Sequence, residues 1–272
     1  MKTVLRSVLL FILGTGLAFA HDNSVVLQAN QGLPAGIREI RLINRVGTIS
    51  IHGIRGSTIR VQALLKPGHG NRIDILGLFT WGGGNNFSKQ TKNGSIRFIP
   101  EGHDQLRIAL DLPHDPRLKA LKVDWRLGIP QKEAVQITNH IGSMSISRMG
   151  AKVWAQNNIG LISILDSSGP IFAHTNIGKI KISGVTHSLF VKTNVGRVKV
   201  RGAITSIRTL YLESNVGSVH VRGIPRFSTH SSGLNNRFLY HGTGHSRIRI
   251  KVNVGSIGLV LVTPPHPTPV RH

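Results

Sequence analysis

The residues whose type and spacing could do chemistry are lysines and arginines set at a regular interval. Lys181 and Lys199 lie 18 residues apart, as do Lys179 and Arg197, and no Asp or Glu stands between them. Like charges about 5 Å apart repel by roughly 0.8 kcal/mol in water, so an uncompensated row of cations favours an anionic partner such as an acidic polysaccharide or membrane phosphate. The alternative is a solvated face that only keeps the protein soluble. The candidate ligand-binding residues are Lys179, Lys181, Arg197, Lys199, Arg201 and Arg222.

Catalytic and metal chemistry have weaker support. From residue 134 onward the only carboxylates are Asp166 and Glu213, more than two repeats apart, whereas a glycosidase pair lies within about 10 Å. No nucleophile elbow or nucleotide-binding glycine motif is present. None of the 14 histidines has zinc-site spacing, although a free N-terminal His21 could chelate copper. We predict no enzyme, no cofactor and no metal site, and keep a β-helix enzyme acting on acidic polysaccharide as an alternative.

The aromatic residues do not favour nucleic acid as a partner. Base stacking needs aromatic side chains interleaved with cations, but Phe172 and Phe190 fall between buried positions, apart from the Lys and Arg columns. The export signal described below argues the same way. Trp125 and Trp154 are expected to pack in the core or at its ends.

The cations belong to a repeat marked by the phrase Asn-x-Gly. From Gly142 to Gly255 the phrase glycines are 18, 18, 18, 21 and 38 residues apart, and Ser231-Ser232-Gly233 falls inside the last gap as a degraded copy. Glycine tolerates the positive φ of a tight turn, and a period this regular is typical of a solenoid. The expected turn glycines are Gly47, Gly142, Gly160, Gly178, Gly196, Gly217 and Gly255.

Alternating aliphatic residues flank each phrase, such as Ile171/Ala173 before Gly178 and Ile180/Ile182 after it. Alternation of this kind indicates strands with one buried side. We therefore predict an all-β fold: a single-stranded parallel β-helix, that is, a solenoid, with about 18–21 residues per coil. Coils stacked at about 4.8 Å would align the asparagines so that they bond side chain to side chain.

We expect a right-handed helix, and a left-handed one is the alternative. A left-handed helix with three six-residue faces also has an 18-residue coil. It would need inward aliphatic side chains where Ser183 and Arg201 stand, so it ranks second.

The first 20 residues have the pattern of a secretory signal: Lys2 and Arg6, an apolar run too short to span a bilayer, and Ala18-Phe19-Ala20 as the cleavage site. The expected organisation is a signal at 1–20, a β-helix at 21–263 with a loop excursion at 66–103, and a Pro-rich tail at 264–272. Removing Lys2 and Arg6 lowers the formal charge from +23 to +21. We expect an exported protein that is periplasmic, on the outer surface or secreted, with no transmembrane segment after cleavage.

The stretch from Leu42 to Gly53, the stretch from Leu106 to Pro113 and the Asn-x-Gly repeats resemble the DUF4097 family of bacterial exported proteins, which are described as adhesins with β-strand repeats. The resemblance implies a right-handed β-helix outside the cytoplasm and carries over no catalytic residues. The resulting hypothesis is a non-enzymatic adhesin or envelope binding protein for anionic ligands. The alternative is a ligand-free scaffold, and the sequence leaves the oligomeric state open.

Overall fold

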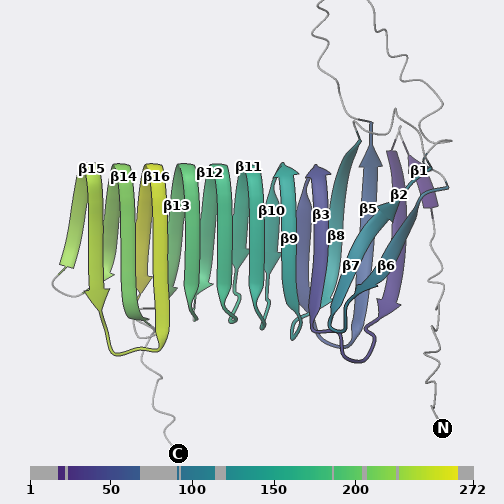
Figure 1. The fold of residues 1–272 in the computed structure, drawn as a ribbon, viewed down its shortest axis with the longest axis horizontal. Helices are drawn as coiled ribbons and strands as arrows, with labels where there is room; N and C mark the ends of the chain where they lie inside the picture. Colours follow the sequence, from purple (N-terminus) through teal and green to yellow (C-terminus); the bar gives the residue numbers. More distant parts are fainter. Residues whose placement is uncertain are drawn as a thin grey trace, which may run out of the picture.

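The computed structural model describes residues 18–21, 24–67, 91, 93–113, 121–185, 187–203, 207–224 and 227–262. The expected tail, most of the expected signal and most of the loop excursion lie outside these ranges. The backbone of His21 is described but its side chain is not, so its assignment as a copper ligand stays a prediction. The described chain is all-β, with sixteen strands joined in one unclosed sheet. Figure 1 shows the strands standing side by side in a row.

The strands follow the alternation expected from the sequence. The first eight are β1 (Ala18–His21), β2 (Ser24–Gly32), β3 (Glu39–Val46), β4 (Ile49–Ile54), β5 (Thr58–Lys66), β6 (Ser95–Glu101), β7 (Gln105–Asp111) and β8 (Lys122–Pro130). The second eight are β9 (Ala134–Ile141), β10 (Met144–Ser147), β11 (Val153–Leu165), β12 (Ile171–Val185), β13 (Leu189–Ala203), β14 (Ile207–Ile224), β15 (Phe227–His241) and β16 (Ser246–Val262).

The strands β11, β12 and β13 form the most regular part of the row. They pair in parallel with a shift of one 18-residue repeat, so that Ile162 faces Ile180 and Ile180 faces Val198. Each strand bends at its phrase glycine, and the segments before and after the bend both place aliphatic side chains in the same core. This in-register parallel stacking of bent strands gives a β-helix-like fold.

The bends require glycine for two reasons. The phrase glycines have φ between +131° and +149°, a region that L side chains rarely adopt. The stacking is also so close that a Cβ on Gly160 would lie 1.9 Å from the carbonyl oxygen of Gly142. Equivalent contacts run from Gly47 through Gly142, Gly160, Gly178, Gly196 and Gly255 to Gly217.

The predicted asparagine column is confirmed. Asn176 donates to Asn158 at 3.2 Å, and Asn194 donates to Asn176 at 3.1 Å. The column continues from Asn194 through Asn253 to Asn215, with amide-to-amide distances of 3.2 and 3.4 Å. Each amide side chain thus bonds its counterpart in the next strand.

The expectation of a wholly parallel stack is wrong at both ends of the row. Near the N-terminus β5 runs antiparallel to β2 and β8, and β6 runs antiparallel to β7. Only residues 102–104 join β6 to β7, and only residues 225–226 separate β14 from its antiparallel partner β15. Connections this short return the chain as a hairpin, because a parallel neighbour needs a longer crossover.

The order of the last strands also differs from the expected one. The row ends β13-β16-β14-β15, so the final strand inserts between two earlier ones. Gly255 accordingly stacks between Gly196 and Gly217. The degraded copy at Ser231-Ser232-Gly233 does occupy the glycine column, with Gly233 facing Gly217, but it runs antiparallel.

At the other end, β1 pairs antiparallel with β2 and includes Ala18, Phe19 and Ala20 of the expected signal. Cleavage after Ala20 would remove three of the four residues of β1. Cleavage itself stays a prediction.

Candidate functional site

The structure brings five of the six candidate cations together on β12 and β13. In the parallel register Lys179 faces Arg197, Lys181 faces Lys199, and Ser183 faces Arg201. All five side chains are exposed, because they alternate with the buried residues of these strands. We call Lys179, Lys181, Arg197, Lys199 and Arg201 the basic face.

The sixth candidate, Arg222, lies apart from the basic face. The inserted strand β16 places Val260 between Arg201 and Arg222. It likewise places Gly258 between Lys199 and His220. The expected cation column through Arg222 is therefore interrupted, for the same reason that the expected strand order is wrong.

Among the described residues no carboxylate forms an ion pair with the basic face. None of the ion pairs formed within the described residues includes one of its five cations, and Arg197 Nε instead donates to Ser256 Oγ at 3.1 Å. At a spacing of about 4.8 Å between strands, these like charges repel one another. The arrangement can bind an extended anion that lies across both strands.

The acidic residue of β14 is engaged elsewhere. Glu213 lies before the glycine bend, on the opposite segment from the basic face, and pairs with Lys251 and with Arg237 at 3.5 Å. The hydrogen bond from Lys251 is the main influence that lowers the pKa of Glu213; burial opposes it, and a hydrogen bond from Tyr211 and the charge of Arg237 add to it. Glu213 is thus an ionised carboxylate held by its own partners.

An aromatic column on the segments before the bend was missed by sequence reasoning. The rings of Trp154 and Phe172 stack with centroids 5.5 Å apart, and those of Phe172 and Phe190 with centroids 5.3 Å apart. The expectation that Trp154 packs in the core is wrong: it is 42% exposed, because it alternates with buried neighbours, whereas Trp125 is 3% exposed as expected. The 18-residue spacing of the three rings was the signal that could have found the column.

Cations flank the aromatic column. Arg249 faces Phe190 in the next strand, and its guanidinium lies 5.4 Å from the ring of Tyr211. Lys152 Nζ lies 6.0 Å from the ring of Trp154. The aromatic residues are therefore separate from the basic face but not from all cations, which revises the sequence-based picture of isolated rings.

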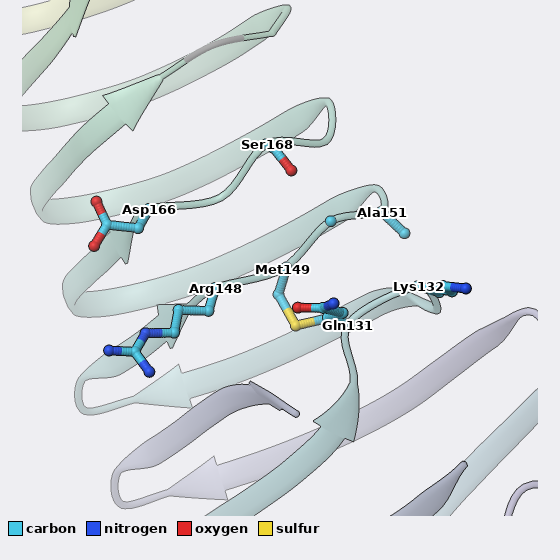
Figure 2. Close-up of a pocket in the computed structure, with 8 residues that line it drawn as sticks. Gln131, Lys132, Arg148, Met149, Ala151, Asp166 and Ser168 are labelled. Atoms are coloured by element: carbon cyan, nitrogen blue, oxygen red, sulfur yellow. The ribbon is translucent and has the colours of Figure 1, made fainter. Parts of the chain in front are cut away.

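A depression of about 510 Å³ lies among the turns that connect successive repeats. Figure 2 shows Arg148 and Asp166 toward one end of it and Lys132 toward the other, so its charged groups do not converge. Arg148 and Asp166 both have positive φ, at 57° and 49°. We assign no ligand to this depression.

Within the described ranges no group of three or more His, Asp or Glu side chains could hold a metal ion. No helix formed by the described residues is long and apolar enough to cross a membrane.

The all-β, β-helix-like class can be compared with known proteins. No protein-family model and no curated protein matches the chain, so the resemblance to the DUF4097 family stays an expectation. Among solved structures, a "putative cell adhesion protein" from Clostridium sporogenes is similar at 12% identity, covering 86% of this chain and 99% of that one, with a TM-score of 0.46. A "putative adhesin" from Bacteroides fragilis is similar at 11% identity, covering 86% and 96%, with a TM-score of 0.29. These scores are low, and the fold rests on the strand pairing above.

Proposed function

We propose that this chain is an exported, non-enzymatic binding protein of the cell envelope that holds an acidic polysaccharide or lipopolysaccharide phosphate on its basic face. The observation that carries the proposal is the register of β12 and β13, which aligns five exposed cations without a carboxylate partner. We further propose that the stack is a right-handed parallel β-helix solenoid. Successive repeats then place cations at equivalent positions of neighbouring strands, as in β12 and β13.

The shape of the basic face suits an extended polyanion. Outward residues along one strand are about 7 Å apart and neighbouring strands about 4.8 Å apart, so Lys179, Lys181, Lys199 and their neighbours form a grid of charge. Such a surface gains affinity from several weak contacts that salt screens. Adhesion is the cellular role such binding would serve.

The enzyme alternative has less support. Asp166 follows β11 and Glu213 lies in β14, four strand positions away in the row. At about 4.8 Å per strand this separates the two carboxylates by roughly 19 Å, which exceeds the span of a glycosidase pair. The scaffold alternative, in which the charge serves only solubility, is addressed by the following experiment.

The test is binding of the purified mature chain, residues 21–272, to lipopolysaccharide, polygalacturonate and uncharged dextran across a salt series. We expect salt-sensitive binding to the two anionic ligands only. The double variant Lys181→Glu/Lys199→Glu should weaken it by at least about tenfold, since each lysine near an anionic surface contributes on the order of 1 kcal/mol.

A matched charge reversal distinguishes a site from net charge alone. Arg60 and Arg126 are exposed on β5 and β8, far along the row from the basic face. The variant Arg60→Glu/Arg126→Glu should leave binding within about twofold. Equal loss in both double variants, or no binding of the wild type at low salt, would overturn the proposal.

A further inference from the structure

The residue next to each glycine of the stacked column forms an exposed apolar line along the row; it precedes the glycine in seven strands and follows it in the antiparallel β15. In consecutive strands the aligned residues are Val46, Ile141, Ile159, Ile177, Val195, Val254, Val216 and Leu234. Their exposed fractions run from 38% at Val46 to 75% at Leu234. We call these eight residues the aliphatic ridge.

The ridge stands at the bend, outside the core. The neighbouring asparagines bond one another, and the phrase glycines stack directly. The residue between them therefore points to solvent, and no core contact demands an apolar side chain there. β-branched residues suit a strand, but threonine would serve that purpose equally, and none of the eight positions has it.

The ridge is long enough to contact an extended surface. Eight side chains at about 4.8 Å spacing cover roughly 34 Å. Continuous exposed apolar stretches usually mark an interaction site. A small ligand would contact only part of this length.

In the middle of the ridge the flanking columns carry cations and no carboxylate; the carboxylate of Asp124 lies at the N-terminal end, where it accepts hydrogen bonds from Thr48. Lys179 and Arg197 lie two residues beyond the ridge, in the column that also holds Ser143, Leu161 and Ser256. On the other side Arg45 and His140 share their column with the bonded asparagines. This charge argues against a second copy of the chain, which would bring two rows of cations together, and favours an anionic apolar partner.

We propose that the aliphatic ridge docks on a bilayer of anionic phospholipid. The side chains of the ridge enter the boundary between headgroups and acyl chains, where apolar area is removed from water, and Lys179 and Arg197 meet lipid phosphates. The inference extends the proposed function, since it shares these two cations, but it concerns a different surface and a different source of affinity.

The test is sedimentation with vesicles of phosphatidylethanolamine and phosphatidylglycerol, compared with phosphatidylcholine vesicles. The wild type should bind the anionic vesicles. The variant Ile159→Thr/Ile177→Thr/Val195→Thr keeps β-branched residues in the strands, and should lower the partition coefficient by about tenfold or more. Its binding to soluble polygalacturonate should stay within about twofold.

The matched control removes three exposed aliphatic side chains that lie off the ridge. Leu165, Leu239 and Val260 are 46%, 59% and 41% exposed. The variant Leu165→Thr/Leu239→Thr/Val260→Thr should bind vesicles within about twofold of the wild type. Equal loss in the two triple variants would overturn the ridge as the docking surface.

A labelling experiment on single-site variants covers the case in which the triple variant misfolds. The chain contains no cysteine, so Ile177→Cys can carry one environment-sensitive dye, with Lys132→Cys in a connecting turn as the control. We expect a blue shift on anionic vesicles at position 177 only. Wild-type binding to polygalacturonate without vesicle binding would overturn this inference and leave the proposed function intact, whereas vesicle binding without polygalacturonate binding would do the reverse.

Discussion

Strands β3 to β8 differ from strands β12 and β13 in whether their cations have carboxylate partners. In the first region carboxylates meet cations: Asp124 pairs with Lys66 at 3.2 Å, and Asp111 pairs with Arg97 at 3.2 Å. In the second region the cations of β12 and β13 have no such partner among the described ion pairs. Part of the positive charge is thus compensated by carboxylates near the N-terminus, whereas within the described residues none of the five cations of the basic face has such a partner.

The two regions also differ in what holds neighbouring strands together. The N-terminal strands mix parallel and antiparallel pairs, and apart from Asn44 on Asn139 their side chains bond unlike partners, as Thr48 bonds Asp124. From β11 onward each residue tends to contact its own counterpart: glycine on glycine, asparagine on asparagine, ring on ring. A substitution there disturbs two neighbouring strands at once, which gives a way to test the comparison.

The largest effect is expected at the stacked glycines. In Gly178→Ala the new Cβ would lie 1.9 Å from the carbonyl oxygen of Gly160, at φ of +148°. Positive φ and overpacking together should cost about 3–5 kcal/mol of unfolding free energy, measurable by urea titration. Gly233→Ala is the control, because Gly233 has φ of +123° and nothing within 4 Å of an added Cβ. A loss in Gly233→Ala as large as in Gly178→Ala would show that stacking is not the cause.

The next effect is expected in the charge-balanced region. Asp124 Oδ1 accepts hydrogen bonds from the amide and hydroxyl of Thr48 at 2.8 and 2.9 Å. Burial raises the pKa of Asp124, but these bonds, a hydrogen bond from Lys66 and the charge of Lys122 outweigh it and hold the pKa below the ordinary 3.8. Asp124→Asn should therefore cost about 1.5–3 kcal/mol at pH 7.

The pH dependence of Asp124→Asn has a definite sign. Because the folded-state pKa is lowered, the stabilisation is present above pH 3.8 and is lost as the pH falls through the lower folded-state value. Urea titrations of wild type and variant from pH 7 to pH 2 should converge at the acid end. A constant difference across that range would contradict the role of ionised Asp124.

A smaller effect is expected in the aromatic column. Phe172 stacks on both Trp154 and Phe190, whereas among the described residues Phe190 stacks on Phe172 alone. Each ring pair contributes about 0.5–1.5 kcal/mol beyond its buried area, so Phe172→Leu should cost about 1–2 kcal/mol and Phe190→Leu about half of that. Thermal unfolding of the two variants provides the measurement, and equal losses would argue against stacking along the row.

The smallest effect is a gain in stability. Asp166 has φ of 49°, and the equivalent residue one repeat later is Gly184, with φ of 74°. Asp166→Gly should relieve the strained backbone and raise stability by about 0.5 kcal/mol after the entropy of glycine is subtracted. Asp166→Asn removes the same charge while keeping the side chain, so a similar gain there would assign the effect to charge.

Much of the fold could be predicted from sequence because its signals are local and repeated. Alternation placed the buried residues of β11 to β13, and the Asn-x-Gly period placed both the bends and the asparagine column. The basic face followed, because Lys179 and Lys181 lie in the repeat directly before Arg197 and Lys199. For repeats that are adjacent in the sequence, the 18-residue period alone is enough to predict which residues face one another.

The errors came from features that the period does not encode. Every Asn-x-Gly strand can stack on every other, so nothing local tells that β16 belongs between β13 and β14, and Arg222 was misplaced for that reason. Trp154 was assigned to the core by residue type, although its position in the alternation faces solvent. The hairpins β6–β7 and β14–β15 depend on loop length, which a search for repeats ignores.

The position of β16 has a consequence for the order in which the strands can assemble. A stack in strict chain order could grow strand by strand, but here the slot between β13 and β14 is filled only when residues 246–262 arrive. Until then the hairpin of β14 and β15 lacks β16, the strand that joins it to β13. The C-terminal strand β16 therefore joins two parts of the sheet. A chain without it would leave the edges of β13 and β14 unpaired and open to degradation or aggregation.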